Sequence, residues 1–175
     1  MRIIDSKPVH LMTGPAQKME DDSRMVADFM GGDGAKRIVC GGTSSQIAAR
    51  YLNKEMTNNN DGTKDVPPTA NIRGLDLVTE GVLTMSHTFK LLRRFDEGDI
   101  DADFFEALDA DNGGAKLARI LLEECTELNL FVGKANNQAN YENNRLFDIS
   151  VRKNLVVQLK DAMEHMGKQV NITYY

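Results

Sequence analysis

Short apolar segments alternate along this chain with longer segments in which apolar residues recur every three or four positions. The short segments predict strands at residues 7–14, 36–40, 74–78, 127–132 and 170–174. The longer segments predict helices around residues 25–30, 47–52, 82–92, 117–125 and 151–166. Because parallel strands are joined through right-handed helical crossovers, this alternation predicts a three-layer α/β/α Rossmann-like sandwich with a mainly parallel sheet of about five strands.

Two stretches interrupt the alternation. Residues 53–71 are rich in Asn, Asp, Gly and Pro, a composition that favours turns, and they predict a flexible, weakly packed surface excursion. Residues 96–111 form an acidic connector in which Phe104, Phe105 and Leu108 predict a short amphipathic helix. The rest of the chain is continuous enough to predict a single domain over residues 1–175.

The acidic connector also resembles the start of a calcium-binding loop. Asp99, Asp101 and Asp103 have the spacing that opens an EF-hand, but Phe104 stands where that motif needs Gly and Ala110 where it needs Glu. We therefore interpret the stretch as a solvated connector and expect no metal site.

Composition narrows the classes of partner. The formal net charge of -5 would repel a polyanion, which argues against nucleic acid. No apolar run approaches the length of a membrane span and the amino-terminal residues lack the apolar core of a secretory signal, so the sequence predicts a cytoplasmic protein that does not contact a membrane. Cys40 and Cys125 lie in apolar segments and are expected to be reduced core thiols, while homo-oligomer formation is left open.

Three loops follow predicted strands and together predict a binding site, because ligands of open parallel sheets bind at the carboxyl ends of the strands, where helix N-termini offer unpaired N–H groups. The expected ligand-binding residues are Gly41, Gly42, Thr43, Ser44 and Ser45 in the first loop, Thr79, Glu80 and Gly81 in the second, and Gly133, Lys134, Asn136 and Asn137 in the third. The glycines and hydroxyls of the first loop suit a phosphate or carboxylate.

Each loop also has a plain structural interpretation. The first could be a helix cap after a glycine turn, Glu80 a first-turn residue favoured by the helix dipole, and residues 133–137 an exposed turn. The first loop matches neither a P-loop nor a dinucleotide fingerprint, so no cofactor is expected.

No catalytic constellation is evident. His10 lies mid-strand and is interpreted as a packed histidine, whereas His87 and His165 fall on helices with no metal-ligand partner in the sequence. Ser44 and Ser45 have no base nearby in the sequence. We therefore expect no catalytic residue in this domain, without excluding a small enzyme whose base is brought in by the fold.

Part of the chain resembles a known extension domain. The segments KRIVCGGTSSQIAARYL at 36–52, VPP at 66–68 and GLDLVTEGVLTMS at 74–86 are similar to the C-terminal extension of bacterial serine/threonine phosphatases of the sporulation stage II protein E family. The resemblance covers residues 36–90 well and the remainder loosely. It implies a phosphatase domain in the same chain or in a partner chain, but not phosphatase activity here, because Asp33 and Asp61 precede glycines in loops without the aspartates that hold two metals.

Three hypotheses follow from the sequence. The leading one is a non-catalytic ligand-sensing or regulatory module, associated with a serine/threonine phosphatase, that binds a small anionic or nucleotide-like ligand at the strand ends. The alternatives are a protein-interaction domain without a ligand and a small enzyme of unknown reaction.

Overall fold

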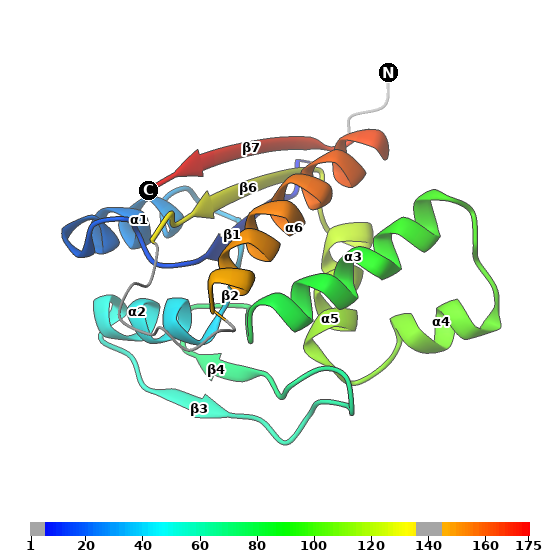
Figure 1. The fold of residues 1–175 in the computed structure, drawn as a ribbon, viewed down its shortest axis with the longest axis horizontal. Coiled ribbons are helices and arrows are strands. Elements are labelled where there is room, and N and C mark those ends of the chain that lie inside the picture. The colour runs from blue at the N-terminus through cyan, green and yellow to red at the C-terminus, as the bar shows by residue number, and fades with distance from the viewer. Residues whose placement is uncertain (1–5, 136–144) are drawn as a thin grey trace.

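The chain folds into an α/β structure built on one sheet, and the computed structural model describes residues 6–135 and 145–175 (Figure 1). Strands and helices alternate as the apolar pattern predicts. In chain order they are β1 (Pro8–Thr13), the 3-10 turn η1 (Met19–Asp21), α1 (Asp22–Phe29), β2 (Lys36–Cys40), α2 (Gly42–Leu52), β3 (Met56–Asn58), β4 (Ala70–Ile72), β5 (Leu77–Thr79), α3 (Val82–Asp96), α4 (Ala102–Leu108), α5 (Gly113–Glu123), β6 (Glu127–Val132), α6 (Arg145–His165) and β7 (Gln169–Tyr174).

The sheet has the order β3-β4-β5-β2-β1-β6-β7. The five strands predicted from the sequence, β5, β2, β1, β6 and β7, lie side by side in this order and are parallel to one another. The predicted number of about five strands is nevertheless wrong, because the described part of the sheet has seven: β3 and β4 add an antiparallel hairpin at one edge. In chain order, the strands up to β5 are added on one side of β1, and β6 and β7 are then added on its other side.

Apolar side chains from this sheet pack in two directions. Leu11 and Ile38 belong to a cluster shared with α3, α5 and α6, whereas their strand neighbours Met12 and Val39 belong to a cluster shared with α1 and α2. Because successive side chains of a strand point to opposite faces, the two groups of helices cover opposite faces of the sheet. Cys40 and Cys125 are buried free thiols, as predicted.

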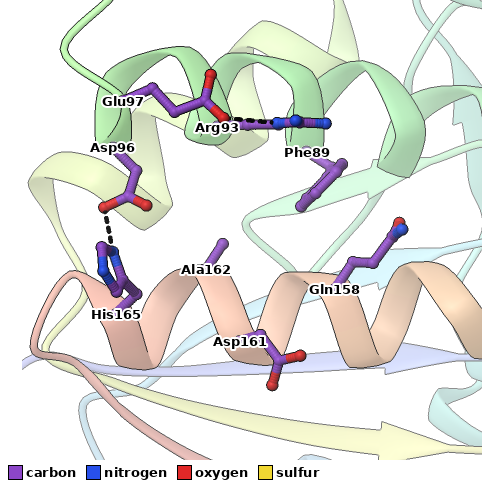
Figure 2. A pocket seen from close by; sticks show the side chains of 8 residues that line it. All are labelled: Phe89, Arg93, Asp96, Glu97, Gln158, Asp161, Ala162 and His165. Carbon is purple, nitrogen blue, oxygen red and sulfur yellow. Dashed lines mark hydrogen bonds and ion pairs between the residues drawn. The ribbon is translucent and has the colours of Figure 1, made fainter.

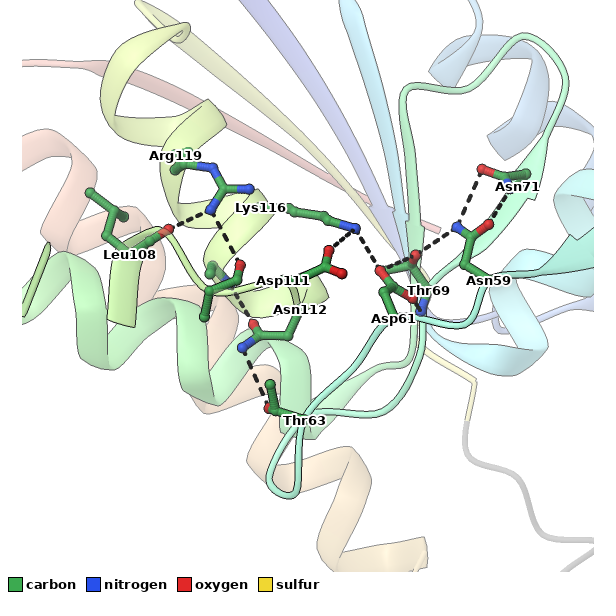
Figure 3. A network of polar contacts seen from close by, with 12 residues as sticks. Asn59, Asp61, Thr63, Thr69, Asn71, Leu108, Asp111, Asn112, Lys116 and Arg119 are labelled. Carbon is green, nitrogen blue, oxygen red and sulfur yellow. Dashed lines mark hydrogen bonds and ion pairs between the residues drawn. The ribbon is translucent and has the colours of Figure 1, made fainter. Parts of the chain in front are cut away.

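The segment 53–71 differs from its prediction. It contains β3 and the first two residues of β4, and the loop between these strands is anchored to α5 (Figure 3). Asp61 accepts hydrogen bonds from the Thr69 N–H at 2.8 Å, the Thr69 hydroxyl at 2.7 Å and the Lys116 ammonium at 2.6 Å. Val66 and Thr69 are buried. Polar side chains thus hold the second part of this segment where apolar ones are scarce, and the flexibility of the excursion stays a prediction.

The acidic connector matches its interpretation. Asp101 caps α4 by accepting a hydrogen bond from the Phe104 N–H at 2.8 Å, and Asp99 and Asp101 both pair with Arg94. Phe104 and Leu108 are buried, whereas Phe105 is exposed. These carboxylates serve a helix cap and ion pairs.

In the part of the chain that is described, no helix combines the length and the apolar character needed to cross a membrane.

Candidate functional site

The strands that precede the predicted loops have their carboxyl ends side by side, at one end of the sheet. Thr13 of β1 is paired with Cys40 of β2 and with Val132 of β6, and Cys40 is paired with Thr79 of β5. The loops that follow these four strands therefore start at the same level. The Gly41 N–H donates to the Thr79 carbonyl at 2.8 Å, which joins the first two predicted loops directly.

The third predicted loop reaches this edge through the loop after β1. A Cβ atom on Gly133 would lie 1.9 Å from the Pro15 carbonyl oxygen, so the two backbones are in contact there. The Ala135 N–H donates to the same carbonyl at 3.1 Å. The β1 loop is thus central to the site, although it is not one of the three loops predicted from the sequence.

The hydroxyls of Ser44 and Ser45 face inward. Ser44 is buried and accepts a hydrogen bond from the Gly14 N–H at 2.7 Å. The Ser45 hydroxyl, also buried, donates to the Gly41 carbonyl at 2.6 Å. Two of the three hydroxyls expected to contact a ligand are therefore committed to internal bonds, one between the first loop and the β1 loop and one within the first loop.

The first turn of α2 presents a different set of groups to solvent. Gly42 and Thr43 are exposed. No residue that the structure describes accepts a hydrogen bond from the N–H groups of Gly42, Thr43 or Ser44, as is usual for the first turn of a helix. A Cβ atom on Gly42 would lie 4.0 Å from a Glu80 carboxylate oxygen. Glu80, a predicted site residue of the second loop, therefore lies beside the first turn of α2.

The other predicted residues play smaller parts. Thr79 is buried and its hydroxyl donates to the Glu80 carbonyl at 2.8 Å, and a Cβ atom on Gly81 would lie 3.5 Å from the Gly41 Cα. Lys134 is exposed and its N–H donates to the Tyr175 carbonyl at 2.8 Å. Asn136 and Asn137 lie outside the described residues.

A cleft of about 570 Å³ opens beside these loops. One wall is a stripe of α2 that runs from Thr43 through Gln46 and the buried Ile47 to Arg50. The other walls come from the β1 loop, η1, α1 and the loop after β6, and their residues are Pro15, Ala16, Gln17, Met19, Asp22 and Ala135. Apart from Thr43, the residues of this cleft are absent from the predicted site.

Sequence reasoning could have found part of the cleft. Thr43, Gln46 and Arg50 are polar residues at helical spacing on a helix whose opposite face is apolar, but that pattern is shared by any surface helix. The contribution of Met19 and Asp22 depends on how the β1 loop turns back towards α2, which no local pattern encodes.

The cleft carries charge of both signs. The Asp22 carboxylate is buried and accepts a hydrogen bond from the Ala16 N–H at 2.9 Å, so it fixes the β1 loop. Arg50 is exposed and forms no ion pair with any described residue, although its guanidinium lies 5.2 Å from the centre of the Tyr51 ring. Arg50 is therefore the cation that this cleft can offer to a ligand.

A second cavity of about 370 Å³ lies between the C-terminal halves of α3 and α6 (Figure 2). His165 Nδ1 lies 2.7 Å from an Asp96 carboxylate oxygen, and Arg93 donates to Glu97 at 2.9 Å along the α3 side of the same cavity. The sequence could not reveal the first pair, whose members are 69 residues apart. α3 and α6 both begin on the side of the sheet where the strands have their carboxyl ends, which is the side of the cleft. Their final turns, which line this second cavity, therefore lie towards the amino ends of the strands.

His10, His87 and both cysteines lie in packed positions. His10 Nδ1 lies 2.9 Å from the Phe29 carbonyl, which confirms its interpretation as a packed histidine. Burial lowers the pKa of His87, which packs against Gly114, and burial raises the pKa of both Cys40 and Cys125 to about 11. Among the residues in view, no three His, Cys, Asp or Glu side chains gather in a way that could hold a metal ion.

No family model matches the chain, and comparisons with curated proteins and with solved structures find no match either.

Proposed function

We propose that this chain is a ligand-binding module whose site is the cleft between α2 and the loop after β1. The observation that carries the proposal is the position of the cleft: about 570 Å³ of space at the carboxyl ends of the central parallel strands, next to a helix N-terminus with unpaired N–H groups.

The lining of the cleft suggests the class of ligand. Thr43 and Gln46 offer hydrogen bonds, Arg50 offers a positive charge, and Met19 and Ile47 offer apolar contact. The stripe from Thr43 to Arg50 spans about 10 Å of helix. A small anionic molecule with an apolar or planar part, of the size of a nucleotide, fits this combination.

Glu80 limits where the anionic group of the ligand would sit. Its carboxylate lies beside Gly42 and would repel a second negative charge placed directly on the helix axis. We therefore place the anionic group towards Arg50 and the polar remainder towards Thr43. This differs from the arrangement expected from the sequence, in which the Gly41–Ser45 loop itself holds the anion.

The regulatory role belongs to the proposal through the sequence resemblance. The similarity of residues 36–90 to a phosphatase extension domain supports a cytoplasmic module that reports ligand binding to a phosphatase domain, without catalysis in this chain. A catalytic alternative finds no support in the geometry of the described histidines and serines. A ligand-free interaction domain is favoured by one observation, the commitment of the Ser44 and Ser45 hydroxyls to internal bonds.

Thermal unfolding with a panel of nucleotides, phosphates and carboxylates tests the proposal. A ligand at about 100 times its dissociation constant adds roughly 2.7 kcal/mol, which raises the melting temperature of a domain of this size by about 5–10 °C. Arg50→Ala removes the cation and Gln46→Trp fills the cleft, so each should abolish most of that shift. Arg73→Ala is the matched control, because Arg73 is exposed outside the cleft.

Two results would contradict the proposal. If no member of the panel stabilises the parent chain, the ligand-free interaction domain replaces it. If a ligand stabilises the parent, Arg50→Ala and Gln46→Trp to the same extent, the site lies elsewhere.

A further inference from the structure

The far edge of the sheet ends in a strand with an open side. β7 is six residues long, pairs with β6 along its whole length, and no described strand lies beyond it. Edge strands of this length are normally protected from pairing with other chains by charges, prolines or bulges. Gln169, Val170, Asn171, Ile172, Thr173 and Tyr174 include no charged residue and no proline.

The backbone of β7 determines which groups face outward. The Gln169 N–H donates to the Thr126 carbonyl at 3.1 Å and the Tyr175 N–H to the Val132 carbonyl at 2.9 Å, so the odd-numbered residues turn their backbone groups towards β6. Because adjacent residues of a strand alternate, Val170, Ile172 and Tyr174 direct their N–H and C=O groups away from the sheet.

We infer that β7 pairs antiparallel with β7 of a second copy of this chain and so joins two sheets into one. In the register centred on Ile172, Val170 faces Tyr174 of the other copy, Ile172 faces Ile172, and Tyr174 faces Val170. An antiparallel hydrogen-bonded pair exchanges two bonds, so three such pairs exchange six. A shift of centre to residue 171 or 173 leaves one of the three outward residues without a partner within the strand.

The side chains on this edge agree with that register. Val170 and Ile172 pack only partly against the core cluster under α6, and Tyr174 is 48% exposed. The two-fold pairing places Ile172 against Ile172 and an aromatic ring against a β-branched side chain, which are favourable cross-strand neighbours. Beside this edge α6 carries the ion pair of Lys160 and Glu164 at 3.0 Å, so the flank presents both signs of charge rather than a repelling excess of one.

The opposite edge of the sheet lacks these properties. β3 has only three residues, and Thr57 and Asn58 are polar and exposed. A strand of three residues offers too few outward groups for stable pairing. The contrast between the two edges selects β7 and provides a control.

Sedimentation equilibrium of the full chain over a range of concentrations tests the pairing. We expect a mass that rises from the 19.5 kDa monomer to twice that value. Ile172→Lys places two cations opposite each other at the two-fold axis and should weaken dimerisation at least tenfold. Tyr174→Pro removes one outward N–H without touching the bonds to β6, so it should weaken the dimer while the circular dichroism spectrum stays that of the parent. Thr57→Lys on β3 should leave the dimer intact.

Amide hydrogen exchange supplies a second readout that does not need a variant. In the dimer, the amides of Val170, Ile172 and Tyr174 should exchange more slowly as the protein concentration rises, while the Asn171 amide, which faces β6, should not change. A parent chain that stays monomeric at about 1 mM would overturn the inference. A dimer that survives both Ile172→Lys and Tyr174→Pro, or one without concentration-dependent protection at these three amides, would do the same.

Discussion

Ser44 joins two loops that are 30 residues apart in the chain. Its hydroxyl accepts the Gly14 N–H at a buried position, so the side chain has a structural role beside the cleft. Thr43, one residue earlier, points to solvent and lines the cleft instead. Adjacent residues of one sequence motif thus divide into one that holds the site together and one that can meet a ligand.

We predict that Ser44→Ala lowers the free energy of unfolding by about 1–3 kcal/mol, because it leaves the buried Gly14 N–H without an acceptor. Thr43→Ala, at an exposed position, should change it by less than about 0.5 kcal/mol. Urea denaturation of both variants measures the difference. Equal effects of the two substitutions would show that the Ser44 bond contributes nothing specific.

At the scale of elements, the hairpin of β3 and β4 depends on α5. Lys116 of α5 lies between two carboxylates, 2.6 Å from Asp61 and 3.1 Å from Asp111, and Asn112 donates to Thr63 from the start of the same helix (Figure 3). Partial burial by itself would raise the pKa of Asp61, but hydrogen bonds from Lys116 and Thr69 outweigh it and lower the pKa. The ionised carboxylate therefore stabilises the attachment of the hairpin loop.

We predict that Asp61→Asn destabilises the chain by about 1 kcal/mol or more at neutral pH, because it removes a charge-assisted hydrogen bond. Since the folded state lowers the pKa of Asp61, this stabilisation is present above the unfolded pKa of about 3.9 and is lost as the pH falls through the lower, folded value. The stability difference between parent and variant should therefore be constant from about pH 5 to 8 and shrink below about pH 4.

Urea denaturation at pH 7, 5 and 3.5 measures that difference. Asp65→Asn is a suitable control, because Asp65 lies in the same loop, is exposed and forms no ion pair with a described residue. A difference that grows as the pH falls would contradict the proposed role of the ionised Asp61.

At the scale of the whole molecule, one place matters most for how the sheet holds together. It is the carboxyl end of β6, where the chain has returned to the other side of β1. The loops after β1 and β6 lie against each other there, and Gly14 and Gly133 let their backbones touch. A Cβ atom on Gly14 would lie 2.7 Å from the Arg152 guanidinium and 2.9 Å from the Gly133 carbonyl oxygen. These contacts hold the loop after β1 and the loop after β6 together at the carboxyl ends of the strands, where the cleft lies.

We predict that alanine at two glycines near the carboxyl ends of the strands changes the free energy of unfolding in opposite directions. Gly133→Ala places a methyl group 1.9 Å from the Pro15 carbonyl oxygen and should cost about 1–3 kcal/mol or more through forced backbone shifts. Gly42→Ala meets nothing nearer than 4.0 Å in the first turn of α2, so it should stabilise the chain by up to about 1 kcal/mol. Melting temperatures of the two variants should move in opposite directions, and a loss of stability of the same size in both would refute the account.

The sequence by itself determined the strands, the helices and the parallel core of the sheet. It could do so because side-chain periodicity is a local property: β1, β2, β6 and β7 and the helices between them appear as alternating patterns, and right-handed crossovers then make the strands parallel. It also brought the loops after β2 and β5 to one edge, since the carboxyl ends of parallel strands coincide. The short hairpin was missed because three-residue strands in a polar segment have no periodicity to detect.

Only the tertiary structure decided which side chains of those loops can meet a ligand. Ser44 and Ser45 turn inward because Gly14 and Gly41 provide their hydrogen-bond partners. Arg50 and Met19, which no sequence motif connects, both line one cleft. The anchoring of Asp61 by Lys116 across 55 residues and the direction of the outward amides on β7 are decided in the same way. Each depends on the distance between groups remote in sequence, and that distance is fixed by how the elements pack rather than by any local pattern.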